Sequence, residues 1–232
     1  MRYHLTARLA GLLFMCAASS LHGLPTVTGI SAEFDIKPEF NRSFYQCWTF
    51  ALHGSVEFDD WISASTGAAL WIGRNASEID YFIKGEAALP LPIPLYTELS
   101  YIFNGMPDYE MYSHSLLPVL AYKNKWAGIA LGVNLRFTSF FGESPIFEST
   151  LAFSGFVNFV NTEKIRAGIE CSNYNNFNAG NMGSYYLSLN GNFAVAQGIV
   201  ICNSLEFYQS GSVGLTSTFY GIAFKAGVLF SW

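Results

Sequence analysis

The 232-residue sequence has little charge and, after its first residues, no long uninterrupted hydrophobic run. Charged residues make up 12% of it, about half of the roughly 25% found in an ordinary globular domain. Hydrophobic residues reach 51% and aromatic residues 17%, which excludes a disordered chain. The net charge of −5 argues against the basic surface that nucleic-acid binding needs, so no nucleic-acid partner is expected. This composition is typical of a membrane protein.

Residues 1–23 are predicted to form a cleaved secretory signal peptide. A basic start is followed by an apolar core at residues 9–18 and then by small residues, so we expect cleavage between Ala18 and Gly23. Residues 24–232 are then expected to form one domain.

No segment of the mature sequence is suited to cross a membrane as a helix. A spanning helix needs about 20 mainly apolar residues, and the best candidate, residues 87–96, is interrupted by Pro90, Pro92 and Pro94. An exported, apolar chain without such helices can still satisfy its backbone hydrogen bonds in lipid as a closed β-barrel.

Apolar and polar side chains alternate along segments of roughly ten residues, as a barrel wall requires. Strands are predicted in this way over residues 30–37, 46–58, 79–89, 95–103, 129–137, 150–159, 164–171, 185–195 and 199–207. Residues 61–72 and 113–122 lack a clear period, and Pro118 removes a hydrogen-bond donor from the second, but both are counted as strands. With a last strand from about Leu215 to Trp232, the prediction is an all-β, antiparallel, up-and-down transmembrane barrel of twelve strands. Ten or eight strands remain as alternatives.

The connections between these strands also sort by length. Every second one is short, such as residues 59–60, 124–125 and 196–198, and the others are generally longer, such as residues 138–147 and 173–183. Short periplasmic turns and longer outer loops are expected of a barrel with both termini in the periplasm. A soluble β-sandwich is the alternative fold. However, the polar face is thin here, and the aromatic residues gather near strand ends, as at membrane interfaces.

The last nine residues resemble the C-terminal targeting strand of bacterial outer-membrane β-barrel proteins. That strand ends on an aromatic residue and has apolar or aromatic residues at alternate positions before it, a pattern that Phe224, Val228, Phe230 and Trp232 fit. The resemblance implies an outer-membrane location in a diderm bacterium, outer-membrane lipid around the barrel, and recognition by the barrel-assembly machinery. Within this class, small porin-like channels and OmpW-like barrels have a size similar to that of this chain. The resemblance to them concerns the architecture and not individual residues.

If the apolar phase of the strands faces lipid, the opposite phase lines the lumen. This phase carries the acids Glu33, Asp35, Glu57, Asp80, Glu86, Glu98, Glu170 and Glu206 and the bases Lys37, Lys84, Arg136, Lys164, Arg166 and Lys225. Enclosed charges must be paired or hydrated. An open pore with this slight acidic excess would weakly prefer cations.

Two functions fit such a barrel. The first is a passive channel for small hydrophilic or amphipathic solutes. The second is a barrel with a filled lumen that acts through its loops as an adhesin or a structural protein. The Asn-rich residues 173–181 are interpreted as an exposed loop, either simply solvated or in contact with a host molecule or antibody.

No catalytic, metal or cofactor site is predicted. His53, Ser55 and Glu57 share a strand face, but successive residues on one face lie about 7 Å apart, too far for direct activation of a nucleophile. An enzyme is therefore not expected. After removal of the signal peptide three cysteines remain, so at least one thiol must be free; all three are interpreted as small buried hydrophobic residues.

Overall fold

The computed structural model describes residues 27–41, 46–58, 61–74, 76–141, 143–179, 183–212 and 216–232. The predicted signal peptide, residues 1–23, lies outside these ranges. Within them, no helix is both long enough and apolar enough to cross a membrane.

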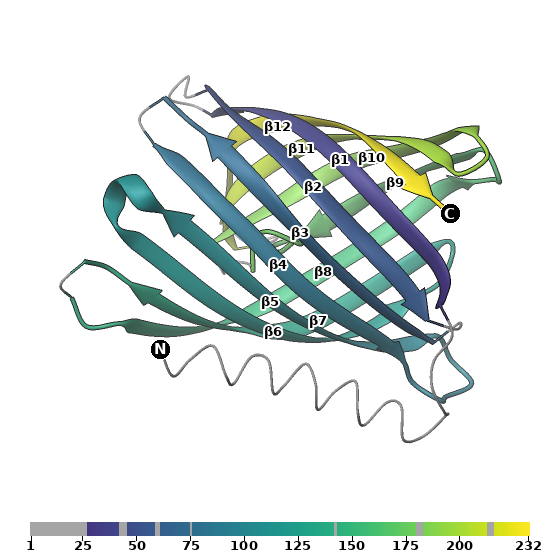
Figure 1. Ribbon diagram of the computed structural model, residues 1–232, viewed down its shortest axis with the longest axis horizontal. Coiled ribbons are helices and arrows are strands. Elements are labelled where there is room, and N and C mark those ends of the chain that lie inside the picture. Colours follow the sequence, from purple (N-terminus) through teal and green to yellow (C-terminus); the bar gives the residue numbers. More distant parts are fainter. Residues whose placement is uncertain are drawn as a thin grey trace.

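The described residues form twelve antiparallel strands in one closed barrel, in which each strand pairs with its neighbours in the sequence and β1 closes on β12 (Figure 1). The strands are β1 (Val27–Asn41), β2 (Gln46–Phe58), β3 (Ile62–Ile72), β4 (Ser77–Ala88), β5 (Leu95–Met106), β6 (Met111–Lys123), β7 (Ala127–Ser139), β8 (Ile146–Asn161), β9 (Ile165–Ser172), β10 (Ser184–Ala196), β11 (Ile199–Ser212) and β12 (Thr216–Ser231). A short 3-10 helix, η1 (Pro107–Tyr109), joins β5 and β6. The predicted twelve-strand up-and-down barrel is confirmed.

The first and last strands form the seam of the barrel. Phe34 and Asp35 of β1 lie opposite Val228 and Gly227 of β12. The seam is closed at its end by Trp232, whose N–H donates to the carbonyl of Ile30 at 2.9 Å. Every strand therefore has two neighbours, and the ring of strands is closed.

Large apolar side chains point outward from the wall. Leu52, Ile83 and Phe159 are each about 60% exposed in the isolated chain. Each has a polar inward neighbour that lines a cavity, namely His53, Lys84 and Asn158. Exposed aliphatic and aromatic side chains over the whole outer face are what a lipid-facing wall requires.

The two segments without a clear polarity period are β3 and β6, and β6 shows why the period is missing. Its burial alternates regularly, with Leu117 and Val119 buried inside and Leu116 and Leu120 exposed outside. Both faces of this strand are apolar, so burial alternates although polarity does not.

The strands extend further than the polarity pattern predicts at the barrel end away from the termini. The predicted loop over residues 138–147 shrinks to residues 140–145, and only the β9–β10 connection, residues 173–183, remains long. Beyond the apolar band both faces of a hairpin meet water, so strand pairing continues where alternation ends. The contrast in length between the two sets of connections is therefore smaller than predicted for most of these loops.

Candidate functional site

The barrel encloses a cavity of about 970 Å³. Met106 and Met111, beside η1, line it at one end of the barrel. Arg166 and Leu229, close to the ends of β9 and β12 on the side of the termini, also line it. The residues that line the cavity thus come from both ends of the barrel.

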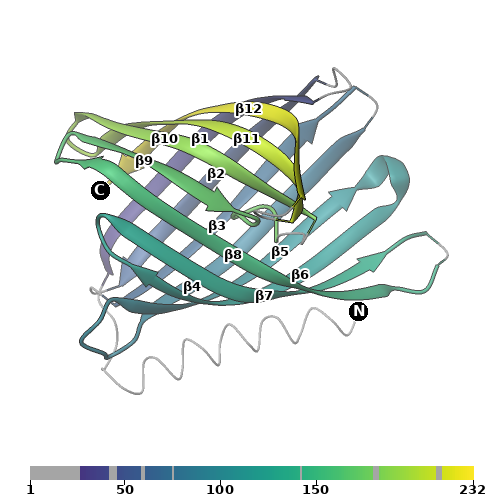
Figure 2. The same cartoon turned by 180° about the vertical axis from the view of Figure 1, so that it is seen from behind.

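The Asn-rich segment after β9 folds into this lumen. We call residues 173–179 the inner loop. Asn173 is 5% exposed and Ala179 is fully buried, whereas Asn175 and Asn178 are exposed. The predicted exposed loop is therefore wrong for the two ends of the inner loop, and residues 180–181 lie outside the described ranges. Figure 2 shows the chain turning into the barrel where β9 ends, short of its neighbour β8.

Apolar residues on the inner wall explain the position of the inner loop. Phe177 and Ala179 pack with Phe82 of β4 and Ile102 of β5. Tyr174 packs on a second buried cluster, which consists of Leu117, Val119, Ala121, Ala130 and Ala152. Without the inner loop these inward side chains would face water in the lumen, so their burial favours the folded-in loop.

Hydrogen bonds and ring contacts fix Phe177 at the wall. The side-chain amide of Asn104 donates to the carbonyl of Phe177 at 2.8 Å and to Asp80 at 2.7 Å. The Phe177 ring meets the Phe82 ring edge to face, with centroids 5.1 Å apart, and its centroid lies 6.1 Å from that of His53. The inner loop therefore rests against β2, β4 and β5. Side chains of β10 to β12 also line the cavity, among them Tyr186, Asn190, Glu206 and Lys225.

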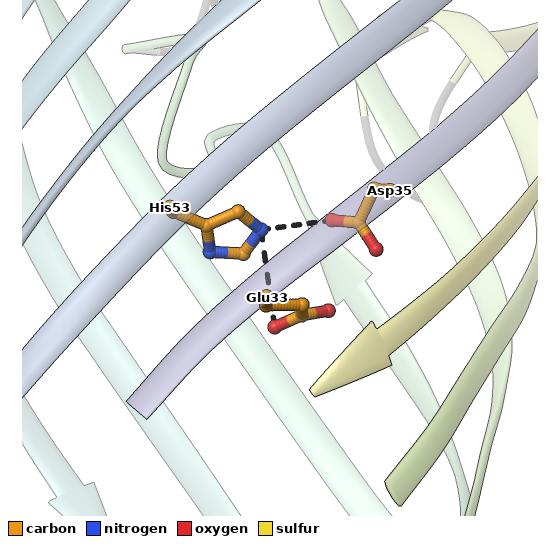
Figure 3. A group of neighbouring side chains, drawn as sticks. All are labelled: Glu33, Asp35 and His53. Atoms are coloured by element: carbon orange, nitrogen blue, oxygen red, sulfur yellow. Dashed lines mark hydrogen bonds and ion pairs between the residues drawn. The ribbon is translucent and has the colours of Figure 1, made fainter. Parts of the chain in front are cut away.

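The first of three charged clusters lies on β1, β2 and β12 (Figure 3). His53 Nε2 lies 2.8 Å from Asp35 Oδ2 and 3.8 Å from Glu33 Oε2. Lys225 Nζ lies 3.0 Å from the same Asp35 oxygen and 3.4 Å from Glu33 Oε1. Glu33, Asp35 and His53 place possible metal ligands within 4.8 Å of one another. The ammonium group of Lys225 pairs with both carboxylates, so the four side chains form an ion-pair network.

Asp35 also depends on a glycine. Its Oδ1 atom is buried and has no hydrogen-bond partner among the described residues. This atom lies against the Cα of Gly227, where an added Cβ would be only 1.9 Å away. Gly227 thus makes room for the carboxylate of Asp35.

Two further clusters follow the same design, in which a lysine is shared by two carboxylates. Lys37 Nζ lies 2.6 Å from Glu39 and 3.6 Å from Glu206, and it donates to the hydroxyl of Tyr208 at 2.9 Å. In the third cluster, Lys84 and Lys123 each pair with both Glu86 and Glu98.

The structure gathers most of the predicted lumen residues. The large cavity is lined by Glu33, Asp35, Lys37, Asp80, Arg136, Arg166, Glu170, Glu206 and Lys225. Lys84 and Glu98 line a second cavity of about 290 Å³, and Glu86 pairs with Lys84. Two predicted lumen residues lie elsewhere. Glu57 is exposed next to the end of β2, and Lys164 lies in the exposed turn before β9 instead of in the wall. Lys164 follows the alternation of β9, but the strand begins one residue later.

Several lumen residues escaped sequence reasoning. Glu39, Glu78 and Lys123 continue the inward phase of β1, β4 and β6 beyond the predicted segments. A feature of the sequence could also have predicted the inner loop. Phe82, Ile102 and Leu117 are apolar at inward-facing positions, where another segment of the chain must shield them from water.

Ser55 and the three cysteines carry the hydroxyl and thiol groups that the sequence analysis considered. Ser55 Oγ lies 2.6 Å from Ser31 Oγ, and His53 pairs with Asp35 instead of Ser55. Cys47, Cys171 and Cys202 are free thiols, and the first and last are buried. Cys171 is half-buried, so burial does not extend to all three.

The fold and the enclosed cavity define a closed transmembrane β-barrel. No protein-family model and no curated protein matches the sequence. Among solved structures, the chain is similar to the NanC porin, with a TM-score of 0.59 and 10% identity over 85% of this chain and 98% of that one. It is also similar to the KdgM porin in complex with disordered oligogalacturonate, with a TM-score of 0.57 and 8% identity over 87% and 99% of the two chains. An outer membrane channel from Pseudomonas putida F1 has a TM-score of 0.57 at 5% identity over 90% and 97%. At these identities the likeness concerns the fold.

Proposed function

We propose that the protein is a passive channel of the outer membrane for small solutes, with a weak preference for cations. The proposal is carried by the 970 Å³ cavity, whose lining residues come from both ends of the barrel. The inner loop narrows the lumen from the side of β2, β4 and β5, and the cavity continues beside it. Structural likeness to two porins and a channel supports the same function.

The proposed cation preference follows from the charges around the cavity. Its acids are Glu33, Asp35, Glu39, Glu78, Asp80, Glu170 and Glu206, and its bases are Lys37, Arg136, Arg166 and Lys225. Lys37 and Lys225 are each shared by two carboxylates, so each of these clusters keeps a net negative charge when His53 is neutral. Such a lining favours cations and does not suit an anionic chain such as the oligogalacturonate named for the KdgM porin.

The test is single-channel recording with the refolded protein in a planar bilayer under a salt gradient. We expect conductance steps and a reversal potential on the cation side. The variant E206Q should move the reversal potential toward zero, since it removes one lumen charge. E163Q, in the exposed turn before β9, is the matched control and should leave it unchanged. An anion-selective reversal potential would refute the charge argument, and a tight bilayer would refute the channel.

A closed barrel that acts at the cell surface is the second candidate. It is favoured by the inner loop itself, because residues 173–179 and the three charged clusters occupy much of the lumen. A bilayer that stays tight, together with binding of the intact barrel to host surface molecules, would support this function.

We also propose that the barrel-assembly machinery recognises the C-terminal strand. Phe224 and Phe230 are exposed on the outer face of β12, and Trp232 is 76% exposed at its end. W232S should lower the amount of protein in the outer membrane more than F219S, which changes another exposed aromatic residue of the same strand. Equal levels of the two variants would contradict this role.

A further inference from the structure

The wall of the barrel has one shortened strand. β9 contains 8 residues, whereas its neighbours β8 and β10 contain 16 and 13. β8 pairs with β9 only from Ser154 onward, opposite Ser172. The part of β8 that precedes Ser154 therefore has no strand on its β9 side, and its backbone groups there need other partners.

Asn173 supplies such partners with its main chain and its side chain. Its N–H donates to the carbonyl of Phe153 at 3.1 Å. Its side-chain oxygen accepts the N–H of Phe153 at 2.8 Å, and its side-chain nitrogen donates to the carbonyl of Leu151 at 2.8 Å. One buried asparagine thus takes the place of the next residues of a strand at the edge of β8.

The chain turns into the lumen directly after this residue. The carbonyl of Tyr174 accepts hydrogen bonds from Ser172 Oγ at 2.7 Å and from Tyr186 Oη at 3.1 Å. Asn175 then closes a tight turn, because its side-chain oxygen accepts the N–H groups of Phe177 at 2.8 Å and Asn178 at 2.9 Å. Asn173 is therefore the point at which the chain leaves the wall instead of continuing β9 along β8.

We propose that Asn173 is a positioning residue, which holds the inner loop in the lumen and so sets the width of the passage. The proposal rests on the proposed channel function. Without the side chain of Asn173, the edge of β8 loses its two side-chain partners. Residues after Ser172 then compete for that edge as a continuation of β9, and the inner loop leaves the lumen. The passage widens as a result.

The experiment follows the inner loop and the passage separately. In a background without Cys47, Cys171 and Cys202, A179C places a thiol at the end of the inner loop, at a position that is fully buried against β4 and β5. Labelling of this thiol by a water-soluble maleimide reports loop release, and single-channel conductance reports the passage. The background protein and A179C alone must first show heat-modifiable gel migration and the conductance of the unchanged chain.

Two variants of Asn173 remove different numbers of bonds. N173A removes both side-chain bonds to β8, and N173D keeps the acceptor for Phe153 but cannot donate to Leu151. Since each buried backbone group left unpaired shifts such an equilibrium strongly, N173A should label at least about tenfold faster. N173D should lie between N173A and the unchanged chain. Both should conduct more per channel.

N124A is the matched control. Asn124 likewise makes two side-chain bonds to the backbone, but its side-chain oxygen accepts both, from the N–H groups of Trp126 at 2.8 Å and Ala127 at 2.9 Å, in the exposed β6–β7 turn. N124A should change neither the rate of labelling at position 179 nor the conductance.

The outcomes separate the two proposals. Unchanged labelling in N173A and N173D overturns the role of Asn173. Faster labelling with unchanged conductance would show that Asn173 holds the inner loop but does not set the width of the passage. If no variant conducts, the channel function is overturned, and labelling alone measures the anchoring of the loop. If N173A gives no heat-modifiable barrel, N173D decides by the same two readouts.

Discussion

Gly227 is a position where one added methyl group should be damaging. Gly227 lies opposite Asp35 across the seam between β1 and β12. In G227A the new Cβ would lie 1.9 Å from Asp35 Oδ1 and 2.9 Å from the carbonyl oxygen of Phe34. That carbonyl belongs to the strand backbone of the seam and has little freedom to move. The carboxylate of Asp35 must therefore leave its place.

The magnitude follows from the contacts that Asp35 would lose. Its Oδ2 atom lies 2.8 Å from His53 and 3.0 Å from Lys225, and a hydrogen bond to a charged group is worth about 1.5–3 kcal/mol. Lys225 keeps Glu33 at 3.4 Å, and the side chains of His53 and Lys225 are 15% and 29% exposed, so water offsets part of the loss. We expect G227A to lower the free energy of unfolding by about 2–3 kcal/mol.

Urea unfolding of the detergent-solubilised barrel, followed by heat-modifiable migration, measures this change. G155A is the control, because its nearest atom would be the carbonyl oxygen of Gly128 at an ordinary 3.8 Å. In a D35A background most of the penalty of G227A should disappear, since the clash is with the carboxylate. A full penalty in that background, or none in the wild-type background, would show that Gly227 does not serve Asp35.

Three further outcomes are expected. F177A should raise single-channel conductance, because it removes the ring that holds the inner loop at the wall; equal conductance would mean that the loop stays in place without it. The thiols of Cys47 and Cys202, 4% and 8% exposed, should resist a water-soluble maleimide until the barrel unfolds, and rapid labelling of folded protein would contradict their burial. K123M should destabilise the barrel by about 1–3 kcal/mol, since it leaves a buried carboxylate with one partner fewer. K125M, in the exposed turn, should be nearly neutral, and urea unfolding of both variants measures the difference.

Much of the wall could be predicted from the sequence, because one face meets lipid and the other does not. Glu33, Asp35 and Lys37 of β1, for example, follow this alternation, and all three line the cavity. The alternation fails in β6, where Leu117 and Val119 are apolar on the inner face. Tyr174 of the inner loop packs on the buried cluster that contains them. The pattern within one strand cannot show that a distant segment of the chain covers its inner face.

The inner loop is the part that sequence reasoning missed. Residues 173–181 are polar and rich in asparagine, a composition that is usual for solvated loops. In the structure the same amides satisfy backbone groups inside the barrel, as Asn173 does for β8 and Asn175 does for its own turn. Whether an asparagine bonds to water or to protein depends on tertiary packing, so composition alone could not distinguish the two.

Because β1 pairs with β12, the closed ring of strands has no first or last strand in space. Ile30 and Trp232 exchange two backbone hydrogen bonds, of 3.3 and 2.9 Å, so a short linker could join the two ends of the barrel there. New ends cut into the exposed turn at residues 124–126 would keep every strand pair. Such a circular permutant carries the former terminal strand inside a continuous chain. It would therefore show whether β12 must be the C-terminal strand for the barrel to assemble, or whether any position in the chain suffices.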